Sequence, residues 1–173
     1  LKVREELHKF FTGETVILQD IFALTDEELV STALMPAFRP AGATNQMAVE
    51  WKRRMGVTVF VEDESKGVLI RYKYSEGLHV PELYFINRSV RPDEDTLGEN
   101  AKSPDELIAV PNKLWLGLFE WCDADTLHFS ITGKHLDPKT LTWFPFCRLP
   151  DGGVACGCWC EGQAHQKVIT YHG

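Results

Sequence analysis

Apolar and polar residues alternate along the middle of the chain, beginning near residue 57. Apolar side chains recur at every second position on both sides of the polar segment 63–67, namely Val57, Val59 and Val61 before it and Val68, Ile70, Tyr72 and Tyr74 after it. A period of two is typical of a strand with one buried face, so the pattern predicts a β-hairpin. On the other face, Glu62 should lie across from Arg71 or Lys73 as an ion pair.

A second stretch with the same alternation covers residues 115–131. Its apolar positions are Trp115, Phe119 and Trp121 before Asp123-Ala124-Asp125, and Leu127, Phe129 and Ile131 after it. Residues of the Asp-Ala-Asp type favour a loop, which predicts another hairpin. Its register places Glu120 directly opposite His128, on the face that the aromatic side chains leave free.

The C-terminal part predicts a third hairpin, with strands at 141–148 and 154–160 and a turn at Pro150-Asp151-Gly152. Proline presets φ, aspartate bonds its own backbone and glycine supplies positive φ. The three-residue loop that this triplet favours places Cys147 opposite Ala155. A two-residue loop would instead place Cys147 opposite Cys156, so a disulfide between these cysteines is not favoured. Residues 168–171 predict a last strand.

Helical signals are fewer and lie mostly outside the hairpins. Helical spacing predicts a short helix at 2–11, residues 15–18 predict a strand, and the capping box that begins at Thr25 predicts a helix through Leu34. The segment from Thr44 to Met55 fits either a helix or an early strand. Ser103-Pro104-Asp105-Glu106 predicts a short helix within the long acidic segment 89–112. A segment of this length is typical of a lid, a binding loop or a disordered stretch.

Eight to ten short strands with regularly spaced turns predict a mainly β fold, a barrel or a sandwich. Successive hairpins favour an antiparallel up-and-down barrel, formed by a single domain over residues 1–173 with an N-terminal helix. The segment 116–127 resembles a strand-turn-strand of lipocalin-like domains, and Phe11-Thr12-Gly13 is similar to the entry of that fold. The resemblance implies a lipocalin-like barrel. Gly13 lacks the tryptophan two positions later that the family has, so no functional residue is carried over.

Composition narrows the classes of function. The chain has 173 residues, a net charge of −7 and only one cluster of cations, Lys52-Arg53-Arg54. We therefore expect no nucleic-acid partner, because nucleic-acid binders have a basic face. No apolar run reaches the roughly 18 residues of a membrane span, and residues 1–6 do not resemble a signal peptide. With an odd number of cysteines, five, these features predict a reducing, cytoplasmic location.

The densest group of reactive side chains is Cys156-Gly157-Cys158-Trp159-Cys160. With Cys147, His165 or His172 it could form a metal site. However, same-face neighbours on a strand lie nearly 7 Å apart, whereas two thiolates on one zinc ion lie within roughly 4 Å. We therefore expect buried apolar cysteines and no metal. No phosphate loop, dinucleotide fingerprint or zinc-protease motif is present, so we expect no cofactor.

Three residues are candidates for acid–base chemistry: Glu120 and His128 as a pair, and His79 at a strand end. A carboxylate beside an imidazole orients the ring and raises its pKa, although a solvated cross-strand pair would look the same in the sequence. Six aromatic residues should point into the barrel and could contact a ligand, or could simply fill the core: Tyr72, Tyr74, Trp115, Phe119, Trp121 and Phe129.

The sequence thus predicts a barrel that binds a small hydrophobic or aromatic molecule, with cofactor-free isomerase, cyclase or lyase chemistry as an option. Two alternatives stay open. The first is a non-enzymatic interaction module that uses the acidic loop, and the second is a domain stabilised by a metal on the late cysteines. Neither the oligomeric state nor the identity of the ligand follows from the sequence.

Overall fold

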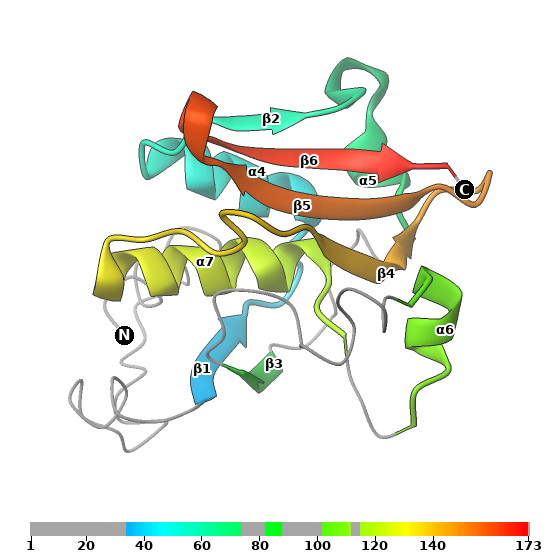
Figure 1. Cartoon of the computed structure of the whole chain (residues 1–173), viewed down its shortest axis with the longest axis horizontal. Coiled ribbons are helices and arrows are strands. Elements are labelled where there is room, and N and C mark those ends of the chain that lie inside the picture. Colours follow the sequence, from blue (N-terminus) through cyan, green and yellow to red (C-terminus); the bar gives the residue numbers. More distant parts are fainter. Residues whose placement is uncertain (1–33, 74–81, 88–101, 112–114, 173) are drawn as a thin grey trace.

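The computed structural model describes residues 34–73, 82–87, 102–111 and 115–172 (Figure 1). The strands of its larger sheet are, in spatial order, β2 (Val59–Val61), β6 (His165–Tyr171), β5 (Val154–Cys160) and β4 (Thr142–Arg148). A separate antiparallel pair consists of β1 (Leu34–Arg39) and β3 (Glu82–Asn87).

The prediction of a closed antiparallel barrel is wrong. The four-stranded sheet is open, with β2 and β4 at its two edges. It is also mixed, because β2 runs parallel to β6 while β5 pairs antiparallel with both of its neighbours. Consecutive hairpins cannot produce a parallel pair, which needs a crossover connection.

Helices account for much of the chain that was predicted as strand. They are α4 (Asn45–Arg54), α5 (Val68–Arg71), α6 (Pro104–Ile108) and α7 (Leu118–Thr132), with 3-10 turns η1 (Glu64–Lys66) and η4 (Glu161–Gln163). α4 settles the ambiguous segment as a helix, and the Oγ1 atom of Thr44 caps it by accepting from the amide of Met47 at 3.2 Å. The helix start predicted at Ser103 is confirmed as the start of α6, where Ser103 and Glu106 form a capping box. The N-terminal elements predicted before residue 34 lie outside the described residues.

The second predicted hairpin is instead the 15-residue helix α7. Nearly every residue from Leu118 to His128 is buried, so the helix has no polar stripe that would reveal a period of 3.6. The Asp-Ala-Asp triplet lies inside this helix rather than in a loop. Gly133 ends it with a φ of +69°, a left-handed conformation that glycine adopts without strain.

The first predicted hairpin is also wrong, because its second strand does not exist. After β2 the chain turns through η1 and forms the short helix α5. β2 pairs with β6 instead, and the carboxylate of Glu62 accepts a hydrogen bond from the amide of Thr170 at 3.0 Å. Glu62 therefore joins two strands that are remote in sequence, rather than facing Arg71 or Lys73 across a hairpin.

The third hairpin and the last strand are confirmed. Arg148 pairs with Val154, which is the register that a three-residue loop predicts. An irregularity further along β4 shifts the register so that Trp143 pairs with Cys156. All five cysteines lie within the described residues as free thiols, so Cys147 and Cys156 form no disulfide.

One face of the larger sheet packs against α4 and α7 to form the main core. Val59, Val61, Ala155 and Val168 contribute from the strands, and the largest buried side chain of α7 is Trp121. α7 lies between this sheet and the β1–β3 pair (Figure 1). No helix among the described residues is both long and apolar enough to cross a membrane.

Gly157 gives a test of this packing, because a Cβ atom there would lie 2.9 Å from the Trp121 ring and 3.0 Å from the Phe144 ring. We expect Gly157→Ala to lower the free energy of unfolding by about 1–3 kcal/mol, the usual effect of overpacking a core. Gly162→Ala is the matched control, since nothing lies within 4 Å of a Cβ at that position. Urea unfolding of both variants measures the difference, and equal stability would contradict the described packing.

Candidate functional site

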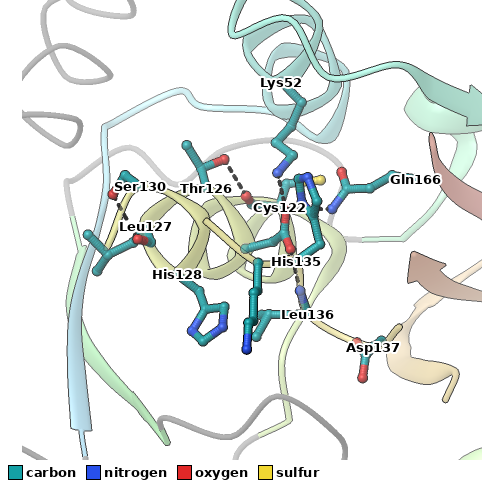
Figure 2. Close-up of polar contacts among 12 residues, drawn as sticks. Lys52, Cys122, Thr126, Leu127, His128, Ser130, His135, Leu136, Asp137 and Gln166 are labelled. Atoms are coloured by element: carbon teal, nitrogen blue, oxygen red, sulfur yellow. Dashed lines mark hydrogen bonds and ion pairs between the residues drawn. The ribbon is translucent and has the colours of Figure 1, made fainter. Parts of the chain in front are cut away.

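The carboxylate of Asp125, within α7, is fully buried and collects four donors. The Leu136 amide donates to Oδ1 at 2.6 Å. Oδ2 accepts from Gln166 Nε2 at 2.8 Å, from His135 Nδ1 at 2.9 Å and from the ammonium group of Lys52. Figure 2 shows Lys52, Gln166 and His135 converging from different parts of the fold. The carboxylate therefore joins α4, α7, the loop after α7 and β6.

Opposite charges make this burial tolerable. The side chains of Lys52 and Asp125 are 1% and 0% exposed, so each charge depends on the other for compensation. Burial alone would raise the pKa of Asp125. The hydrogen bond from His135 and the nearby charge of Lys52 outweigh it and hold that pKa below the ordinary value. Asp125 is thus a carboxylate at neutral pH.

The imidazole ring of His135 is held by rings on both sides as well as by Asp125. Phe129 stacks on it with ring centres 4.3 Å apart, and Trp159 stacks on it at 3.7 Å. A carboxylate can only accept, so the hydrogen bond to Asp125 puts a proton on Nδ1 and leaves Nε2 of the neutral ring with a lone pair. The ring thereby has one defined tautomer and one defined plane.

The Nε2 atom of His135 is accessible. It makes no hydrogen bond within the described part of the chain, and it is not among the buried polar atoms without a partner. The side chain as a whole is 8% exposed. One acceptor nitrogen of a fixed imidazole is therefore left unbonded and not fully buried at the edge of an aromatic stack, which is the arrangement that a general base requires.

Asp137 fixes the loop that carries His135. Its Oδ2 atom accepts from Thr142 at 2.7 Å and from the Trp121 indole at 2.8 Å, and its Oδ1 atom accepts from Thr140 at 3.0 Å. Burial raises the pKa of Asp137, although these hydrogen bonds oppose the change. The Asp137 carbonyl oxygen also accepts from the amide of Trp159 at 3.1 Å, so the loop is anchored beside the ring that stacks on His135.

Cys122 lies close to this network (Figure 2) but is a poor candidate for a nucleophile. Burial raises the pKa of its thiol to about 12, and the lowering effect of Lys52 does not reverse this. Only the thiolate is strongly nucleophilic. Across the described residues, no three His, Cys, Asp or Glu side chains are arranged to hold a metal ion.

Glu120 and His128 do not form the predicted pair. Both are in α7, eight residues apart, which is about 12 Å along the helix axis. Glu120 instead forms an ion pair with Arg39 at 2.7 Å, and His128 is buried. His79 lies outside the described residues.

The six aromatic residues have no barrel interior to line. Tyr72, Phe119 and Trp121 are buried in the core. Trp115 donates its indole N–H to the Leu107 carbonyl at 2.6 Å, and Tyr74 lies outside the described residues. Phe129 contacts the candidate site through its stacking on His135, and the Trp121 indole bonds to Asp137 in the loop that carries His135.

A pocket of about 390 Å³ lies elsewhere, at the turn between β4 and β5. Its lining residues are Arg71, Lys73, Arg148, Leu149 and Pro150. Trp159 marks the other end of β5, five residues beyond Val154 and therefore about 16 Å away along the strand. The pocket and His135 do not form one site.

No protein-family model, curated protein or solved structure matches the chain. The functional argument therefore depends on the geometry and chemistry of the site. The sequence did not predict the main residues of this site, which are Lys52, Asp125, His135 and Gln166. Lys52 was in the ambiguous segment and Asp125 in a predicted loop, and no local signal connects them.

Asp125→Asn tests whether the buried carboxylate stabilises the fold. The variant leaves Lys52 buried without its counter-charge, so we expect a loss of about 3–5 kcal/mol near pH 7. The control is Asp63→Asn, which changes an exposed carboxylate paired with Lys66 at 3.0 Å and should cost about 0–1 kcal/mol.

Wild type and Asp125→Asn should also differ in how their free energy of unfolding depends on pH. Because the folded pKa of Asp125 lies below its ordinary value of 3.8, the carboxylate stabilises the fold above pH 3.8, and this contribution is lost as the pH falls through the folded pKa. The stability gap between wild type and Asp125→Asn should shrink as the pH falls below 3.8. Urea unfolding at each pH measures it, and a gap that stays the same below pH 3.8 would contradict the assignment.

Proposed function

We propose that the protein is a cofactor-independent acid–base enzyme in which His135 is the catalytic residue and moves a proton through Nε2. The observation that carries this proposal is the pairing of a buried carboxylate on Nδ1 with a solvent-accessible acceptor on Nε2 of the same ring. A general base needs a lone pair aimed at the substrate and a partner that stabilises the cation formed on proton uptake.

Asp125 is a positioning residue in this proposal. It selects the Nδ1–H tautomer and lies next to the positive charge that forms when Nε2 takes up a proton. Lys52 and Gln166 hold the carboxylate in place from two other elements. Such preorganisation means that little reorganisation is needed during proton transfer.

The aromatic rings restrict how a substrate reaches His135. Phe129 and Trp159 cover both ring faces, so a substrate would approach the ring edge. The fitting substrate is a small molecule with an acidic O–H or an activated C–H. Many isomerase, cyclase and lyase reactions begin with such a proton transfer, so these reaction classes stay in the proposal without the barrel. Five free thiols support the predicted reducing, cytoplasmic location.

A generic ester tests the proposal without knowledge of the substrate. We expect His135→Gln to lower the protein-dependent hydrolysis of p-nitrophenyl acetate at least tenfold, since general-base catalysis contributes about 10²–10⁴-fold. The control is His172→Gln, which removes an exposed imidazole 3.9 Å from Asp151 and should leave the rate unchanged. Circular dichroism confirms folding of each variant. Equal rates for wild type and His135→Gln would refute the proposal.

The tautomer gives a second test in the wild-type protein. Two-bond ¹H–¹⁵N correlation spectra at neutral pH should show His135 with its proton on Nδ1, and Asp125→Asn should alter this signature and the pH profile of ester hydrolysis together. A proton on Nε2 would exclude His135 as a base at that nitrogen.

A further inference from the structure

The three cysteines of β5 lie on the sheet face opposite the helices. Side chains alternate along a strand, so Cys156, Cys158 and Cys160 share one face of β5. Gly157 and Trp159 face the other way, toward the core residue Trp121 and toward His135. In the pairing with β6, Cys158 is opposite Lys167 and Cys160 is opposite His165.

Two of these thiols are much closer together than the strand spacing implies. The Sγ atoms of Cys158 and Cys160 are 3.9 Å apart, although same-face neighbours on a strand are separated by nearly 7 Å. The side chains lean toward each other and close the gap. Cys156 does not take part, because its thiol points to the Ile169 carbonyl oxygen at 3.7 Å.

This separation matches that of two thiolates on one metal ion. Two sulfur atoms at about 2.3 Å from a tetrahedrally coordinated ion lie about 3.8 Å apart, close to the 3.9 Å observed. The spacing argument that excluded a metal from the sequence therefore fails for this pair. A disulfide would instead require the sulfur atoms to approach to about 2.05 Å.

We propose that Cys158 and Cys160 form a two-thiolate binding site for a soft monovalent metal ion, Cu(I). Soft thiolate ligands select Cu(I). At the observed separation of the two sulfur atoms the S–Cu–S unit would be bent, so one ligand from solution would complete a three-coordinate site. Within the described ranges no third side chain completes a cluster that could hold a metal ion, which disfavours a zinc site with four protein ligands. Both thiols are partly exposed, so an ion can reach them without unfolding.

The charges at the site balance on binding. One Cu⁺ displaces the protons of both thiols, forms two Cu–S bonds and leaves a net charge of −1 on the complex. Lys167, across from Cys158, supplies a compensating positive charge. Burial, followed by the neighbouring Cys160, raises the pKa of Cys158 to about 11, and Lys167 opposes this shift. Because the metal displaces thiol protons, the apparent affinity should rise with pH.

The test is an anaerobic titration of the reduced, full chain with Cu(I) in competition with the chromophore bicinchoninate. The wild type should remove one Cu(I) per chain from the chromophore, with an affinity that increases with pH. Cys158→Ser and Cys160→Ser should each weaken binding at least tenfold. Cys156→Ser is the matched control, because it lies on the same face of the same strand, two residues from Cys158, and it should bind as the wild type does.

Alkylation of the wild type covers the case in which a serine variant fails to fold. Bound Cu(I) should protect Cys158 and Cys160 from iodoacetamide, as located by fragment mass spectrometry, while the alkylation of Cys156 stays unchanged. The proposal is overturned if the wild type takes no copper from bicinchoninate, if Cys156→Ser weakens binding as much as Cys158→Ser, or if Cu(I) protects neither thiol. Neither experiment involves His135, so the outcomes of both experiments are independent of the acid–base proposal.

Discussion

A buried carboxylate has to be neutralised, and the arrangement of this fold follows from how Asp125 meets that requirement. Its ammonium partner comes from α4, its amide partner from β6, and its imidazole partner from the loop after α7. If any of these elements moved, a polar group would be left without compensation in the core. A buried ion pair of this kind adds little stability compared with an apolar core of the same volume, so we infer that its main contribution is to favour this arrangement of sheet and helices over others.

The elements that the sequence predicts correctly are those whose signals lie close together in the chain. The hairpin at Pro150-Asp151-Gly152 and the start of α6 depend on residues within a few positions of each other, and these local signals were sufficient. The prediction for α7 was wrong because the partners of its polar residues are remote in the sequence. A helix buried on nearly all sides has no polar stripe, and its aspartates resemble a loop unless their partner is known. That partner, Lys52, is 73 residues away.

The parallel pairing of β2 with β6 illustrates the same limit. Three residues of β2 were correctly expected to be a strand, but the strand beside them comes from the other end of the chain. The candidate site follows this pattern too. A carboxylate and an imidazole were predicted within the segment around α7, and the structure does pair such groups there. The pair consists of Asp125 and His135, however, because a helix places Glu120 and His128 too far apart.

Because side chains alternate along a strand, the side chains of the two proposed sites lie on opposite faces of the same sheet. Trp159 and Gln166 are paired across β5 and β6 and face the helices, where one stacks on His135 and the other bonds to Asp125. Their neighbours Cys158 and Lys167 are also paired, but face the opposite side. A bound ion at the thiols would lie on the far side of the sheet backbone from the imidazole. The strand that fixes one wall of the proposed acid–base site thus presents the two thiols on its other face, so one segment could contribute to both proposed sites without either constraining the other.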